Sequence, residues 1–113
     1  MDYAKPRQLV LLLLLVLALA LPVVAQEGAT IVGTVTDPSG ATVPGVQITV
    51  TNSATGQILR NVSNGAGQYV VTALGVGTYN VTAEISGFKK FEQKNVVLNV
   101  GDRLRVDIVL QVG

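Results

Sequence analysis

Branched apolar residues alternate with polar residues on both sides of a tight turn in the segment 30–50. Val and Ile recur between Thr and Gln in 30–36 and again in 46–50, which is the period of strands that place one face on a core and the other in water. Between them, Asp37-Pro38-Ser39-Gly40 has the composition of a β-turn, because Asp accepts bonds from nearby backbone, Pro presets φ and Gly tolerates a positive φ. This segment therefore predicts a strand, a turn and a second strand.

Turn residues recur at roughly ten-residue intervals through the rest of the chain, and no helical pattern of useful length follows residue 25. The strands predicted from these intervals cover residues 30–36, 46–52, 58–63, 68–73, 78–86, 96–100 and 103–110. We therefore predict an all-β fold, a seven-stranded antiparallel Greek-key β-sandwich of the immunoglobulin-like kind. Residues 58–63 are predicted to form an edge strand, since Ile58 and Leu59 fall on opposite faces and Arg60 discourages edge-to-edge pairing.

The alternation also predicts which side chains face the core. The last strand is expected to point four apolar residues inward and three charged residues outward, respectively Leu104, Val106, Ile108 and Leu110, and Arg103, Arg105 and Asp107. Tyr69 and Tyr79 share the phase of the inward valines two positions later. We predict that both rings lie half in the core, with their hydroxyls reaching an edge.

The first 25 residues have the pattern of an export signal. Lys5 and Arg7 precede a wholly apolar run over 9–21, and Val23 and Ala25 suit the −3 and −1 positions of a cleavage site. We predict a helical signal peptide over 1–25 and one domain over 26–113. An uncleaved membrane anchor is the alternative, although a spanning helix needs about 20 apolar residues and Pro22 interrupts the run.

Cys and His are both missing from the sequence, and their absence limits its chemistry. Without Cys there are no disulfides, zinc–thiolate sites or thiol nucleophiles, and without His the commonest general base and metal ligand is absent. The acidic residues Asp37, Asp102 and Asp107 do not have the spacing of a calcium loop. We therefore predict that the protein is not an enzyme and has no catalytic residue, cofactor or metal site.

Charge argues against nucleic acid as a partner. Residues 26–113 contain six basic residues, Arg60, Lys89, Lys90, Lys94, Arg103 and Arg105, against six acidic residues, Glu27, Asp37, Glu84, Glu92, Asp102 and Asp107. A balanced surface of this kind lacks the basic excess that nucleic acids or anionic membranes require. The one basic cluster, Lys89, Lys90 and Lys94, encloses Glu92 and is expected to be a solvated surface.

A series of short motifs in fixed order resembles the carboxypeptidase regulatory-like domain, a transthyretin-like (prealbumin-like) sandwich. The matching positions are Gly33, Val35, Asp37, Gly40, Pro44, Gly45, Asn64, Gly67, Tyr69, Leu74, Gly77, Tyr79, Gly87, Phe88 and Leu110. Among these, Gly40, Gly67 and Gly87 are expected at turns that need a positive φ.

The chain is most similar to the copy of this domain at the amino end of Oar-type TonB-dependent outer-membrane receptors. That resemblance implies a non-catalytic accessory domain in the periplasm or at the outer membrane of a Gram-negative bacterium, or outside the cell. Its expected partner is a protein or another cell-envelope component. Contact with a membrane is expected only through a receptor barrel that these 113 residues do not include, so the chain is expected to be part of a receptor.

Two other functions remain open at this point. A stand-alone carbohydrate-binding module of the related starch-binding-like fold would need exposed aromatic rings, and Tyr69, Tyr79 and Phe91 are the candidates, with Phe91 the best exposed. Their positions favour core packing over a sugar platform. A structural or adhesive surface domain would instead offer a long unpaired strand to a partner.

Overall fold

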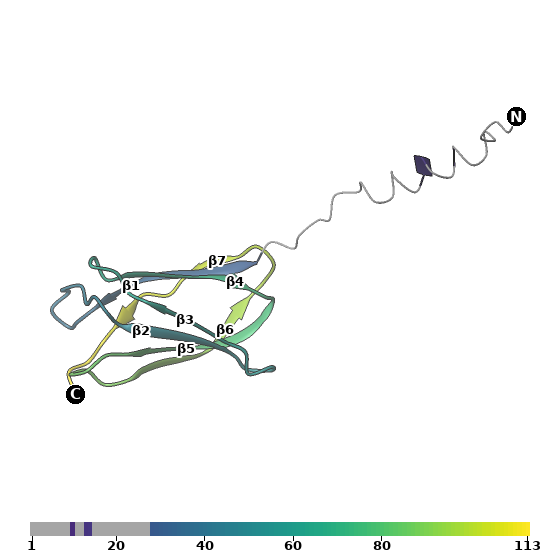
Figure 1. Ribbon diagram of the computed structural model, residues 1–113. Coiled ribbons are helices and arrows are strands. Elements are labelled where there is room, and N and C mark those ends of the chain that lie inside the picture. The colour runs from purple at the N-terminus through teal and green to yellow at the C-terminus, as the bar shows by residue number, and fades with distance from the viewer. Residues whose placement is uncertain (1–9, 11–12, 15–27) are drawn as a thin grey trace, which may run out of the picture.

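The computed structural model describes Val10, Leu13, Leu14 and residues 28–113, and residues 28–113 form two facing β-sheets (Figure 1). The first sheet has the order β4 (Gln68–Leu74), β1 (Ala29–Thr36) and β7 (Arg103–Arg105), with β8 (Ile108–Val109) paired to the far end of β1. The second sheet has the order β3 (Ile58–Val62), β2 (Gln47–Asn52), β5 (Gly77–Glu84) and β6 (Phe91–Leu98). The predicted all-β sandwich is confirmed.

The strand at the C-terminal end differs from the prediction in two ways. The predicted strand 103–110 is divided into β7 and β8, which gives eight strands instead of seven. Both pieces run parallel to β1, so the first sheet is mixed and not wholly antiparallel. The cause is the connection 99–102, which enters the first sheet beside the beginning of β1, where the Thr30 N–H donates to the Asp102 carbonyl at 2.7 Å.

Strand β6 begins at Phe91, five residues before the predicted start at residue 96. Residues 92–95 are exposed and polar because β6 is the outer strand of its sheet. Asn95 adopts a φ of 60°, and the pairing with β5 shifts register between Tyr79 and Val81. This bulge interrupts the alternation by which strands are detected. The prediction that 58–63 forms an edge strand is confirmed by the position of β3.

The core lies between the sheets and is made of aliphatic side chains and two tyrosines. The alternation noted in 46–50 is confirmed, since its apolar residues Val46, Ile48 and Val50 are all fully buried. In the last stripe Val106, Ile108 and Leu110 are buried, whereas Leu104 is 36% exposed, so the prediction for Leu104 was wrong. Leu104 belongs to a three-residue strand at the edge of its sheet, where the inner face is only partly covered.

The turn after β1 is held by the carboxylate of Asp37. Its Oδ1 accepts bonds from the Ser39 N–H at 2.9 Å, the Ser39 hydroxyl at 2.6 Å and the Ala41 N–H at 3.1 Å. The Ser39 hydroxyl is the main reason that the pKa of Asp37 lies below its usual value. The three glycines expected at positive φ have it, with φ of 86° at Gly40, 73° at Gly67 and 90° at Gly87.

The described chain enters the sandwich at one end and finishes at the other (Figure 1). The last residues lie against the turn after β5, where the Lys89 N–H donates to the Gln111 carbonyl at 2.7 Å and the Gly113 N–H donates to the Gly87 carbonyl at 3.1 Å. The predicted signal peptide over 1–25 lies outside the described residues except for Val10, Leu13 and Leu14, which are helical and exposed. Among the described residues, no helix has the length and apolar character needed to span a membrane.

Candidate functional site

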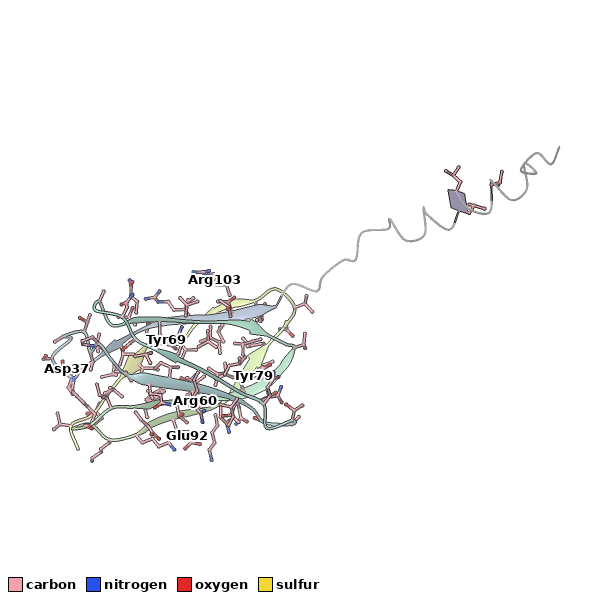
Figure 2. The ribbon with its side chains drawn as sticks, in the orientation of Figure 1. Asp37, Arg60, Tyr69, Tyr79, Glu92 and Arg103 are labelled. Carbon is pink, nitrogen blue, oxygen red and sulfur yellow. The ribbon has the colours of Figure 1, made fainter. Side chains whose placement is uncertain are left out.

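The two predicted candidate tyrosines lie between the sheets (Figure 2). Tyr69 and Tyr79 are each only 2% exposed, so they are more deeply buried than the half-buried rings that were predicted. The Tyr69 hydroxyl donates to the Val106 carbonyl at 2.6 Å, and the Tyr79 hydroxyl donates to the Gly75 carbonyl at 2.8 Å. Phe91 is half-buried and packs against the core. The structure therefore does not bring these three rings together on an open surface.

Gly33 on β1 leaves the space that the Val106 carbonyl and the Tyr69 ring occupy. A Cβ atom at residue 33 would lie 2.7 Å from Cε1 of Tyr69 and closer still to the Val106 carbonyl oxygen. That carbonyl points inward over the glycine and accepts the Tyr69 hydroxyl. Burial raises the pKa of Tyr69, and the negative charge of Asp107 raises it further. Two of the recurring motif residues, Gly33 and Tyr69, therefore depend on one backbone carbonyl.

Asp107 lies in the gap between β7 and β8 and completes the hydrogen bonding of β1 there. Its Oδ1 accepts the Thr34 N–H at 2.9 Å, so that a carboxylate replaces the backbone carbonyl that a continuous strand would offer. Its Oδ2 lies 3.0 Å from Nε of Arg105, whose Nη2 donates to the Thr34 hydroxyl at 3.2 Å. The Thr34 N–H is the main cause that lowers the pKa of Asp107, and Arg105 adds to it.

A shallow hollow of about 250 Å³ lies on the outer face of the first sheet, directly above this network. We call it the outer-face hollow, and its lining comes from β1, β4 and β7: Val32, Gly33, Thr34, Gln68, Val70, Arg103 and Arg105. The register explains the grouping, because Val32 pairs with Val70 on one side and with Arg105 on the other. Arg103 lies on the outer side of this sheet in Figure 2. The hollow thus combines a valine floor with two guanidinium groups.

A second hollow of about 400 Å³ lies at the end of the sandwich beside the turn after β5, and it is lined by Gln47, Glu84, Ile85, Ser86, Phe88 and Lys90. Its charges are already paired, since Lys90 Nζ lies 3.2 Å from Glu84 Oε1. Lys94 is likewise 3.7 Å from Glu92. The side chains of both pairs are largely exposed, so the basic cluster around Glu92 is a solvated surface with two of its three lysines paired.

Within residues 28–113 no group of acidic side chains is arranged to hold a metal ion. All three aspartates considered for calcium have structural partners: Asp37 holds its turn, Asp102 Oδ2 accepts the Asn99 N–H at 2.8 Å, and Asp107 Oδ1 accepts the Thr34 N–H at 2.9 Å.

The sequence interpretation placed Arg103 and Arg105 outward but did not connect them with a site. The spacing of two residues on one strand was a signal that their side chains share a face. It could not show that Val32 and Val70 lie beside them, because that requires knowing that β1 is flanked by β4 and β7.

The family of this chain follows from its match to known sequences. The model of the carboxypeptidase regulatory-like domain matches residues 30–111. The chain belongs to this family. A search of curated proteins finds no significant match to this chain.

Solved structures share its fold. A candidate carbohydrate-binding protein from Bacteroides uniformis has 26% identity and a TM-score of 0.60. The match covers 73% of this chain and 40% of that protein. The pilus 2b backbone protein of group B streptococcus has 18% identity and a TM-score of 0.62 over 80% of the chain and 43% of that protein. Chlorocatechol 1,2-dioxygenase from Pseudomonas putida has 11% identity and a TM-score of 0.60 over 76% of the chain and 61% of the enzyme. At these low identities the pilus protein and the dioxygenase share only the fold.

Proposed function

We propose that this regulatory-like domain is an exported, non-catalytic binding domain that serves as the N-terminal periplasmic extension of a TonB-dependent outer-membrane receptor. The observation that carries the proposal is the use of the motif residues. Gly33, Asp37, Tyr69 and Tyr79 all hold turns, sheets or core together. Since the recurring residues maintain the sandwich, function is left to its surface, where binding needs no reactive group.

Export is supported by the basic start and apolar run of the first 25 residues. We expect the full chain, expressed in a Gram-negative host, to be recovered in the periplasmic fraction with the mass of residues 26–113. Replacing Leu13 and Leu14 by Arg should keep the protein in the cytoplasm, whereas Leu13→Ile with Leu14→Ile should leave export unchanged. Recovery of the unprocessed wild-type chain in the cytoplasm would refute this part of the proposal.

Membership of a receptor is tested separately on the gene. We expect the DNA that follows the Gly113 codon to encode a plug and a barrel, in the same reading frame or in a shifted one. A stop codon followed by unrelated genes would contradict the receptor assignment and leave export untouched.

Carbohydrate binding is the second candidate function, favoured by the similarity to the Bacteroides protein. Calorimetric titration with starch and xylan oligosaccharides, repeated with Phe91→Ala, tests it. Phe91 is the least buried of the three candidate rings. Heat of binding that disappears in this variant, while its thermal unfolding stays close to wild type, would support a sugar site.

A further inference from the structure

The outer-face hollow carries positive charge that its own surroundings do not neutralise. Among residues 28–113 Arg103 forms no ion pair, and the lining contributes two guanidinium groups against the single carboxylate of Asp107 beside them. Elsewhere in residues 26–113 there are four basic and five acidic residues, so the domain as a whole has no net charge. An excess of one positive charge is therefore placed over the valines of this face.

The guanidinium group of Arg105 is already held in position by neighbouring side chains. Asp107 engages Nε of Arg105, and the Thr34 hydroxyl engages Nη2. Within the described residues no hydrogen bond occupies Nη1, so part of the donor fork stays available. A side chain already fixed in this way loses less conformational entropy when it binds a carboxylate.

The floor of the hollow is aliphatic. Val70 is 40% exposed, and Val32 is half-buried next to it. None of the residues that line the hollow is aromatic, so it offers no ring on which a sugar could stack. An aliphatic floor beside cationic groups fits a peptide side chain better than a sugar.

We propose that the outer-face hollow binds an extended acidic segment of a partner protein, with carboxylates at alternate positions on Arg103 and Arg105 and the methylene groups of the same acidic side chains against Val32 and Val70. This inference rests on the proposed binding function and specifies its ligand. Arg103 and Arg105 are two residues apart on one strand, so their Cα atoms are separated by about 6.4–6.8 Å. Carboxylates at alternate positions of an extended peptide have the same spacing, which allows both charges to be met at once.

Another role for these arginines is protection of an edge strand against unwanted pairing. Arg60 provides the comparison, because it is an exposed arginine on β3, an edge strand of the other sheet (Figure 2). If charge at any sheet edge were sufficient for peptide binding, Arg60 would contribute as much as Arg103. If binding takes place in the outer-face hollow, Arg60 should contribute little or nothing.

The test is titration of the ¹⁵N-labelled full chain with two capped peptides, Glu-Val-Glu-Val-Glu and Lys-Val-Lys-Val-Lys, followed by NMR. We expect the acidic peptide to shift amide signals of β1, β4 and β7, and the basic peptide to leave them in place. Arg103→Gln should weaken binding by about fivefold or more, as loss of a charge-assisted bond predicts. Arg60→Gln should stay within about twofold of wild type. Arg103 has no ion pair with any residue of 28–113, so the fold of its variant should be retained, and the unliganded spectrum verifies this.

Equal weakening by Arg103→Gln and Arg60→Gln would overturn the proposal, as would shifts confined to other strands. Tighter binding of tri-galacturonate than of the acidic peptide at the same signals would show that the ligand is a sugar acid and that the peptide assignment is wrong. None of these outcomes depends on where the chain is located, so failure here is distinguishable from failure of the proposed export or receptor assignment.

Discussion

Replacing Gly33 by Ala tests the contact on which the first sheet depends. The new methyl group would enter space held by the Val106 carbonyl and the Tyr69 ring, so one of them must move. Overpacking of this kind costs about 1–3 kcal/mol, and leaving the Tyr69 hydroxyl and its buried acceptor unpaired costs about 1–3 kcal/mol more. The reduced freedom of the unfolded chain returns up to about 1 kcal/mol. A net loss of about 3 kcal/mol is therefore expected.

In a domain of this size, a loss of about 3 kcal/mol lowers Tm by roughly 12–24 °C. Thermal and urea unfolding followed by circular dichroism measure it. Gly65→Ala is the matched control, because nothing lies within 4 Å of a Cβ at that position and Gly65 is not among the glycines with positive φ. The control should unfold within about 0.5 kcal/mol of wild type.

A double-mutant cycle with Tyr69→Phe identifies the mechanism. Since Gly33 and Tyr69 act on the same carbonyl, the two changes together should cost less than the sum of the single changes, by about 1 kcal/mol. Strict additivity would mean that the two residues act independently. A Gly33→Ala protein that melts within about 3 °C of wild type would refute the packing argument itself.

Three further results are expected. Tyr79→Ala should lower the free energy of unfolding by about 3–5 kcal/mol because its ring is in the core, and a urea midpoint close to wild type would contradict this. The pKa of Asp107 is lower in the folded protein than its unfolded value near 3.9, so its contribution to stability is present above about pH 4 and is lost as the pH falls through the folded value. Asp107→Asn should therefore flatten the acid side of a plot of Tm against pH. An unchanged acid side would contradict this prediction. The pKa of Tyr69 is raised, so its contribution to stability is complete below about pH 10 and declines above it. Tyrosinate absorbance at 295 nm should show that Tyr69→Phe removes one group that ionises only as the chain unfolds. If that group ionised in wild type before unfolding, the result would argue against burial of Tyr69.

The strands with regular alternation could be predicted from sequence, and those without it could not. In β1 and β2, buried residues alternate with more exposed ones along the whole strand, so the inward residues are readable. The predicted start of β6 lay five residues too far along the chain, because four of the first five residues of this strand are exposed at an edge and a bulge at Asn95 changes the phase. Leu104 has the inward phase and the apolar character of a core residue. Only the edge position of β7 explains its exposure.

The candidate site was less predictable than the fold because it is formed by strands far apart in sequence. Arg105 lies opposite Val32, and Val32 lies opposite Val70, which are pairings that local spacing does not specify. The family motif identified Gly33 as an important position, but the sequence did not show why glycine is needed there. That reason is a carbonyl more than 70 residues further along the chain.

The parallel placement of β1 beside β7 and β8 has a mechanical consequence. Strand β1 starts at one pole of the sandwich, and the chain leaves β8 toward the opposite pole (Figure 1). Tension between Ala29 and Gly113 would therefore slide these neighbours past each other, straining several bonds across the seam together, including Val106 N–H to the Val32 carbonyl and Thr34 N–H to Asp107. Shear of this kind resists force better than peeling, which breaks bonds one after another.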